Sequence, residues 1–291
     1  MRAWMMMAAW ALAACAPDVD GEVKPTPAQI GLSECEDWDE WERPARPFTV
    51  FGPVDYVGTC GITALLVETG AGYVLLDTGT EGGAEVVMDN LRRLGVAPED
   101  VVAILSSHEH FDHVGGMAWM QAATGAEVIA GAVAAEVLRT GEADGRDPQY
   151  GMHDAMAPVA VGRVLADGES VEIGGVEFTM IATPGHTPGA VSWAWEACEG
   201  EVCRDVVYAD SLSPVSAEGY RFSDHPDYVA GYRAGLERLA GLECDLLLTP
   251  HPSASGMVAR AVEGFPADGE ACVRYAEGIA ARLDKRLGEE G

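Results

Sequence analysis

The sequence predicts a protein of the α/β class, built as a four-layer αββα sandwich around two mixed β-sheets. Short strand-like runs and helical segments alternate through residues 48–291, and they fall into two halves that each contain both kinds of element. The chain has 291 residues, and 48% of them are hydrophobic, which is enough apolar material for more than one buried layer.

Strands and helices alternate in the first half. A Gly-containing turn at 69–72 joins two expected strands as a hairpin, and an apolar strand runs directly into a histidine cluster. Strands are expected at Phe48–Phe51, Ile62–Glu68, Tyr73–Asp77, Val101–Ser106 and Glu127–Ala130, and helices at Ala84–Leu94, Gly116–Ala123 and Ala132–Arg139. The Gly-, Asp- and Pro-rich segment 141–159 is long for a connection and is a candidate active-site flap.

The second half repeats this order. Its strands are expected at Val171–Ile173, Val176–Ile181, Ala190–Trp195, Val206–Tyr208 and Asp245–Leu248. A helix is expected at Asp227–Ala240, and further helical segments at the C-terminal end.

The first 14 residues have the features of a secretory signal: one basic residue, Arg2, and then an apolar stretch too short to span a bilayer. The stretch ends Leu12-Ala13-Ala14-Cys15, which resembles the bacterial lipobox. We therefore expect a lipoprotein-type signal peptide at 1–14, a lipid on Cys15 and a periplasmic protein anchored to the outer membrane. A plain signal peptide with a chance cysteine is the alternative. The Pro- and acid-rich residues 15–47 are interpreted as a tether or extension leading into the domain at 48–291.

The formal net charge of −29 limits the partners of the protein. A charge of this sign and size disfavours binding to nucleic acid or to an anionic membrane surface, so membrane contact is expected only through the lipid on Cys15. We expect a monomer that acts on a small molecule.

The cysteines indicate an oxidising compartment. Once Cys15 is set aside for the lipid, an even number remains, and none lies in a CxxC pair. The sequence itself leaves their pairing open. These cysteines are Cys35, Cys60, Cys198, Cys203, Cys244 and Cys272.

The strongest functional signal is the run of residues 108–113, His-Glu-His-Phe-Asp-His, which follows the expected strand 101–106. Residues i and i+2 of an extended chain point the same way, so His108 and His110 can share one cation, and Asp112 and His113 can turn toward a second. His186 and His251 lie in Gly/Pro turns after other strands. Imidazole and carboxylate ligands without thiolate favour zinc, and another first-row metal is the alternative.

These motifs resemble the metallo-β-lactamase superfamily over roughly residues 48–291, and most closely the third subclass of true (class B) metallo-β-lactamases. The resemblance implies two zinc ions per chain. One would be held by His108, His110 and His186, and the other by Asp112, His113 and His251. Asp77 in Leu75–Gly79 matches a buried aspartate that orients the metal ligands without binding metal; a turn-forming aspartate is the alternative.

The same resemblance implies further roles. Ser211 and Ser213 would hold a substrate carboxylate, and Tyr220 would donate to the developing oxyanion; an ordinary serine-rich turn is the alternative for the two serines. The subclass that binds zinc through a cysteine near position 211 is disfavoured because Ser211 stands there. The implied disulfides are Cys35–Cys60, Cys198–Cys203 and Cys244–Cys272.

The activity implied is hydrolysis of the β-lactam amide of penicillins, cephalosporins and carbapenems by zinc-bound hydroxide. The alternative is a di-zinc lactonase or another ester or thioester hydrolase of the superfamily, in which Asp210 would bridge both metals. A non-enzymatic zinc lipoprotein is disfavoured, because structural zinc sites are closed and usually rich in sulfur. A serine hydrolase is disfavoured by the lack of a GxSxG motif.

Overall fold

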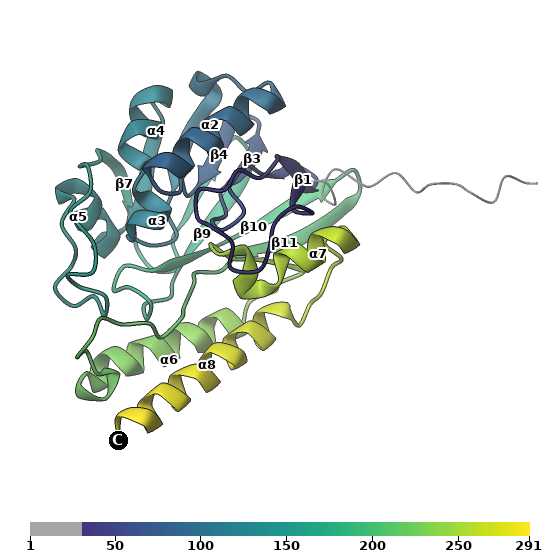
Figure 1. Cartoon of the computed structure of the whole chain (residues 1–291). Coiled ribbons are helices and arrows are strands. Elements are labelled where there is room, and N and C mark those ends of the chain that lie inside the picture. The colour runs from purple at the N-terminus through teal and green to yellow at the C-terminus, as the bar shows by residue number, and fades with distance from the viewer. Residues whose placement is uncertain (1–30) are drawn as a thin grey trace, which may run out of the picture.

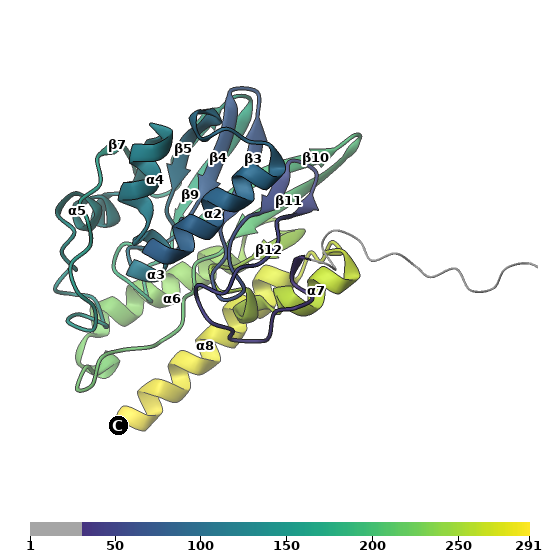
Figure 2. The same ribbon diagram turned by 45° about the horizontal axis from the view of Figure 1, so that its top comes forward.

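The computed structural model describes residues 31–291 and shows four layers, as predicted (Figure 1). Helices α2 (Glu81–Leu94), α4 (Met117–Thr124) and α5 (Ala132–Thr140) cover a seven-stranded sheet. Helices α6 (Pro226–Ala240) and α8 (Ala271–Glu290) cover a five-stranded sheet on the opposite side of the molecule. Figure 2 shows the same arrangement after a 45° rotation.

The first sheet contains β1 to β7 in chain order. Strands β1 to β4 pair antiparallel, whereas β4 to β7 pair parallel, so the carboxyl ends of the parallel strands meet at one edge. The strands are β1 (Phe48–Phe51), β2 (Val54–Tyr56), β3 (Leu65–Thr69), β4 (Gly72–Leu76), β5 (Val101–Leu105), β6 (Glu127–Gly131) and β7 (Val161–Leu165).

The second sheet has the order β12-β11-β10-β9-β8. Its pairs are antiparallel except for β11 with β12, so this sheet is mixed as well. The strands are β8 (Ser170–Ile173), β9 (Val176–Ala182), β10 (Val191–Glu199), β11 (Val202–Tyr208) and β12 (Leu246–Leu248).

Three hydrophobic cores separate the four layers, and strand alternation distributes side chains between them. In β3, Leu65 and Val67 point into the core between the sheets, whereas Leu66 points to the core under α2 and α4. This explains why a continuous apolar run, without polar alternation, forms a strand here: both of its faces are buried. Tyr232 and Leu283 belong to the third core, between the second sheet and its helices.

The expected boundaries needed some correction. Strands β2 and β7 and the short helix α3 (Phe111–Val114) were not predicted, and helix α7 (Met257–Glu263) was predicted only as part of a general C-terminal helical region. Strand β2 has three residues, and β7 is mostly exposed, so neither carries a clear hydrophobic pattern. Helix α2 begins three residues before the expected start, because the Thr80 hydroxyl caps it by accepting from the Gly83 N–H.

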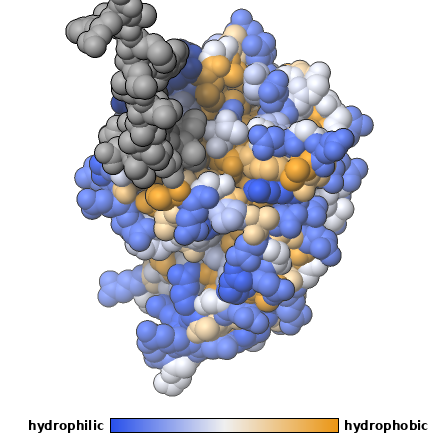
Figure 3. Space-filling view, turned by 90° about the vertical axis from the view of Figure 1, so that its right-hand side faces the viewer, coloured by the Kyte–Doolittle hydropathy of each residue, from blue (hydrophilic) through white to orange (hydrophobic). Residues whose placement is uncertain are grey.

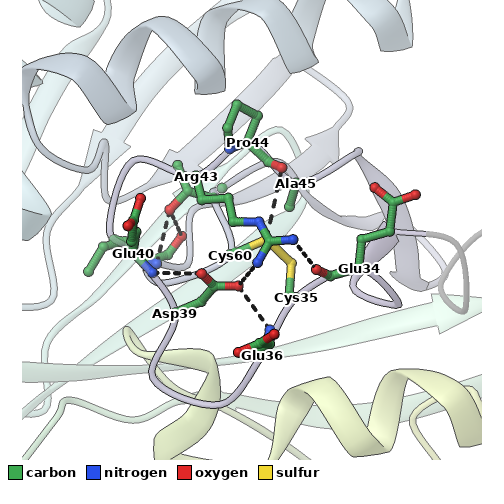
Figure 4. The surroundings of a disulfide bond; sticks show 12 residues. Glu34, Cys35, Glu36, Asp39, Glu40, Arg43, Pro44, Ala45 and Cys60 are labelled. Carbon is green, nitrogen blue, oxygen red and sulfur yellow. Dashed lines mark hydrogen bonds and ion pairs between the residues drawn. A yellow bond between two sulfur atoms is a disulfide. The ribbon is translucent and has the colours of Figure 1, made fainter.

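Residues 31–47, the described part of the expected tether or extension, are packed onto the domain. Leu32 is fully buried, and Cys35 is bonded to Cys60 (Figure 4). The Arg43 guanidinium lies 2.7 Å from the Asp39 carboxylate and donates to the Glu34 carbonyl, which closes the loop around this disulfide. The signal peptide expected at 1–14 and the lipid on Cys15 lie outside the described residues.

The structure also pairs Cys198 with Cys203 across the β10–β11 hairpin and Cys244 with Cys272 between β12 and α8. These are the pairs that the family resemblance implies. In residues 31–291, no helix has the length and apolar content needed to cross a membrane. On the face drawn in Figure 3, hydrophilic side chains predominate and hydrophobic ones lie in separate groups among them.

We predict that peptide mapping without reduction will recover these three bridges. Because Cys198–Cys203 spans only 5 residues and Cys35–Cys60 spans 25, replacing the first pair by serine should cost less stability, by about 1.4 kcal/mol in the chain-entropy account. Urea unfolding of the two double variants measures this difference. Cross-paired peptides, or a larger loss from the hairpin pair, would contradict the prediction.

Candidate metal centre

The histidine cluster forms where β5 ends. His110 has an extended backbone and precedes α3, so His108 and His110 project the same way and their ring centroids lie 5.1 Å apart. Helix α3 then turns the chain and carries Asp112 and His113 in its single turn. The carbonyl of His113 accepts hydrogen bonds from the backbone N–H groups of Thr78 and Gly79, which fasten α3 to the loop after β4.

His108, His110 and His186 form the first group of candidate ligands. Their ligand atoms lie within 4.8 Å of one another, and all three side chains are buried. His186 comes from the turn between β9 and β10. A Cβ on Gly185 would lie 2.3 Å from the Tyr232 ring, so glycine is needed beside His186 for this close approach.

One nitrogen of each of these rings is occupied by a partner of its own. Asp210 lies 2.7 Å from Nδ1 of His108, and the Ser213 carbonyl lies 2.9 Å from Nδ1 of His186. Asp147 lies 2.9 Å from Nε2 of His110. The other nitrogen of each ring therefore remains as a lone-pair donor, which is how protein partners orient metal-binding histidines.

Asp112 and His113 form a second group, together with His108, within 4.8 Å. His251, which the resemblance assigns to this group, follows β12, and its Nε2 lies 3.4 Å from the Asp112 carboxylate. Its Nδ1 lies 3.2 Å from the Gly61 carbonyl, so Nε2 is its free nitrogen. The structure thus brings together all six side chains expected to hold the two metals.

The pKa values of three of the six candidate ligands are shifted in the direction that metal binding requires, because ligands bind metal in their deprotonated form. Burial lowers the pKa values of His108 and His186 well below the usual range and so keeps both rings neutral. Burial alone would raise the pKa of Asp112, but the adjacent His113 and His251 outweigh it and hold that pKa well below the ordinary value. Asp112 is therefore ionised.

Asp77 lies behind the ligands, at the end of β4. Its buried carboxylate accepts from the Ser107 N–H at 2.7 Å, the Ser107 hydroxyl at 2.6 Å and the Tyr208 hydroxyl at 2.8 Å. It lies 3.7 Å from Nδ1 of His113. Its backbone has φ +59°, a conformation that costs energy for a residue with a Cβ. This geometry matches an orienting residue better than an ordinary turn aspartate.

The side chain of Asp210 does not lie between the two groups. One carboxylate oxygen faces Nδ1 of His108 and the other accepts from the Leu212 N–H at 3.0 Å. Asp210 therefore lies behind His108, on the side opposite the free Nε2, and is not grouped with the candidate ligands. A metal-bridging aspartate, as in the lactonase alternative, would need the opposite orientation.

Glu109 was missed by the sequence analysis. Its buried carboxylate accepts from the Thr187 hydroxyl at 2.7 Å and from the Gly189 N–H at 2.8 Å. These bonds tie the turn that carries His186 to the cluster after β5. Burial raises the pKa of Glu109 to about 7, although the bond from Thr187 opposes this shift.

A cavity of about 280 Å³ opens onto the two groups. Ser211 and Ser213 line it, and the hydroxyl of Ser211 is buried with no hydrogen-bond partner in the described part of the chain.

Trp38 and Trp41 line the same cavity from the N-terminal segment, and Gln149 lines it from the expected flap. Sequence reasoning missed the two tryptophans, because contacts distant in sequence bring their segment to the site: the Cys35–Cys60 bridge and the hydrogen bond from the Trp38 N–H to the Ser253 hydroxyl. The exposed His153 also lines this cavity.

Tyr220 is not among the residues that line this cavity, and its role as an oxyanion donor stays a prediction. Its ring stacks on His225, with centroids 4.7 Å apart, and meets the edge of Phe222 at 5.2 Å. It packs against the hydrophobic core under α6 and α8, and burial raises its pKa to about 12. Aromatic packing thus fixes the orientation of its ring.

The donor set fits zinc. Nε2 of His108 is buried without a hydrogen-bond partner among residues 31–291, an arrangement that is costly unless a cation accepts its lone pair. All six donors are imidazole or carboxylate, and two neighbouring sites with cavity access are typical of a hydrolytic di-metal centre. The fold and the site thus define a di-zinc hydrolase of the αββα class.

The chain belongs to the metallo-β-lactamase superfamily, whose family model matches residues 57–251. It is similar to the structure of the MIM-2 metallo-β-lactamase, with 52% identity, a TM-score of 0.88, and coverage of 92% of this chain and 99% of that one. It is also similar to MEM-A1, a subclass B3 metallo-β-lactamase from a soil metagenome library, with 41% identity, a TM-score of 0.82 and coverage of 86% and 98%.

A curated relative has a different activity. The hydroxyacylglutathione hydrolase of Serratia proteamaculans is 31% identical over 128 residues, which are 44% of this chain and 41% of that relative. The match therefore spans less than half of that protein, whereas the β-lactamase structures match over nearly their whole length.

We predict that Asp147→Ala will weaken zinc binding about 10–100-fold, because His110 loses the partner that orients it. Competition with a chromophoric chelator measures this change. Asp144→Ala is the matched control, since Asp144 lies in the same segment and pairs with Arg146 outside the site. Equal zinc affinities in the two variants would contradict the orienting role.

Proposed function

We propose that this protein is a di-zinc β-lactamase that hydrolyses the β-lactam amide of penicillins, cephalosporins and carbapenems. The observation that carries this proposal is the all-histidine group beside Asp112, His113 and His251, with the unpartnered Ser211 hydroxyl facing the same cavity. Its near-complete overlap with subclass B3 structures supports the same activity.

Bound zinc supplies Lewis acidity and activates water as a nucleophile at neutral pH. The residues of the chain do the rest. The three histidines of the first group and the three side chains of the second fix two adjacent sites, and their partners set which nitrogen of each ring is free. Ser211 does not act as a nucleophile in this proposal, because its hydroxyl has no basic partner at hydrogen-bond distance in the described residues.

Ser211 and Ser213 supply the substrate contacts. A β-lactam carries a carboxylate at a fixed distance from its reactive carbonyl, and a free hydroxyl can donate to it. Tyr275 of α8 holds this segment by donating to the Ser211 carbonyl at 2.8 Å. Trp38 is 66% exposed and offers a flat apolar surface to the rest of the substrate.

Thioester and lactone hydrolysis are supported less well. Asp210 faces His108, and the match to the hydroxyacylglutathione hydrolase covers 41% of that relative. Export as a lipoprotein through Cys15, and a monomeric state, belong to the same proposal. They rest on the lipobox-like sequence and on the acidic charge.

Turnover of a chromogenic cephalosporin by the purified protein tests the activity. We expect turnover that a chelator abolishes and added zinc restores, because the six side chains can act only with metal bound. Asp112→Ala should lower zinc content from two ions to about one and reduce kcat much more than it reduces stability. Full turnover by metal-free protein would contradict the mechanism.

The two serines separate the candidate activities. Ser211→Ala combined with Ser213→Ala should raise KM for penicillins about tenfold or more, because hydrogen bonds to a charged carboxylate are lost. Hydrolysis of a neutral lactone should change little, and Ser170→Ala, on the exposed end of β8, is the control. Wild-type protein that hydrolyses acyl-homoserine lactones far faster than any β-lactam would overturn the proposal.

A further inference from the structure

A second open cavity, of about 530 Å³, lies beside the metal cavity. It is formed by the turn after β12, by α7 and by α8, which lie side by side in Figures 1 and 2. Trp38, Ala254 and Arg282 line both cavities. Tyr275 also links them, since it lines the second cavity and donates to the Ser211 carbonyl in the first.

The charge of this second cavity is opposite to that of the protein. The whole chain has 18 Lys and Arg against 47 Asp and Glu, yet Arg260, Arg274 and Arg282 all line this space. Asp268 is the single acidic residue among its lining residues. A concave site in which one sign of charge predominates concentrates the electric field and attracts counter-ions. The three arginines therefore make the second cavity favourable for anions.

Only one of the three guanidinium groups has an ion-pair partner in residues 31–291: Arg274 pairs with Asp268. Arg260 donates from Nη1 to the Leu247 carbonyl at 2.6 Å, but its buried Nη2 has no partner in the described residues. Arg282 is exposed, and no ion pair or hydrogen bond of its side chain occurs within residues 31–291. A buried N–H without an acceptor is costly, so an oxygen ligand would stabilise Arg260.

We propose that this arginine cavity binds carboxylate or other oxyanion groups of small molecules. Because this cavity adjoins the metal cavity, the bound group has two possible sources. One is a second carboxylate on a substrate whose reactive amide lies at the metals, and this source rests on the proposed function. The other is a free anion. The planar guanidinium groups of Arg260 and Arg282 suit oxygen pairs of this kind.

Calorimetric titration of the holoenzyme with sulfate, at constant ionic strength in chloride, tests the anion site. Arg282→Gln and Arg274→Gln should each weaken sulfate binding about tenfold, because each removes a charged donor. Both residues are exposed, so the variants should fold. Arg139→Gln, on the exposed side of α5, makes the same charge change away from the cavity and should bind sulfate as the wild type does.

Kinetics identify the source. Benzylpenicillin and carbenicillin differ by one side-chain carboxylate. If that carboxylate occupies the cavity, Arg282→Gln should raise KM for carbenicillin relative to benzylpenicillin about tenfold, and Arg139→Gln should leave this ratio unchanged. An unchanged ratio together with lost sulfate binding supports the site with a free anion as its ligand.

The proposal is overturned if the Arg282 and Arg274 variants match Arg139→Gln both in sulfate affinity and in the KM ratio. This result differs from failure of the proposed function. A protein that turns over no β-lactam would disprove the β-lactamase activity, while the sulfate titration would still decide whether the arginine cavity binds anions.

Discussion

The candidate site depends on the hydrogen bonds that the buried Asp77 carboxylate accepts. Asp77 follows β4, and its carboxylate accepts from Ser107 after β5 and from Tyr208 of the other sheet. One side chain therefore fixes the relative positions of three strand ends. A buried carboxylate is tolerated only when it is well hydrogen-bonded, and the φ of +59° adds backbone strain. The hydrogen bonds from Ser107 and Tyr208 offset this strain, and they form only when the two sheets are correctly placed relative to each other. His113 and α3 are then held directly above it.

Hydrogen-bond acceptors also orient the other candidate metal ligands. Asp210, Asp147 and two backbone carbonyls each take one nitrogen of a histidine ring. Because a neutral imidazole has one N–H and one lone pair, these acceptors decide which nitrogen faces the metals. The centre is therefore organised by residues that touch no metal, and they come from both halves of the chain.

The sequence could predict what depends on local pattern. The histidine run, the Gly/Pro turns of His186 and His251, and most strands were recognised because spacing and apolar runs are local signals. Asp147, Glu109 and the tryptophans were missed because each acts through a contact more than 35 residues away, such as His110 with Asp147 across 37 positions. The ring contacts of Tyr220 with Phe222 and His225 were missed for the related reason that packing under α6 and α8 sets them. Residues 31–47 have a tether-like composition, but the disulfide to Cys60 overrides it.

The charge distribution adds a constraint on substrates. A chain with a formal charge of −29 repels anions at long range, and at about 0.15 M ionic strength that repulsion is screened beyond roughly 8 Å. Binding of an anionic substrate must therefore rely on donors within the cavity itself, where water is scarce and a charged hydrogen bond is worth more. The hydroxyls of Ser211 and Ser213 are neutral, so in the proposed role they would bind a carboxylate without adding positive charge next to the two metals. Arg260 and Arg274 line only the second cavity, whereas Arg282 lines both, so two of the three cationic side chains lie outside the cavity that contains Asp112. If the proposed arginine cavity binds an anion, Arg260 and Arg274 would supply positive charge to it from outside the metal cavity, and Arg282 would supply it at the boundary of the two cavities.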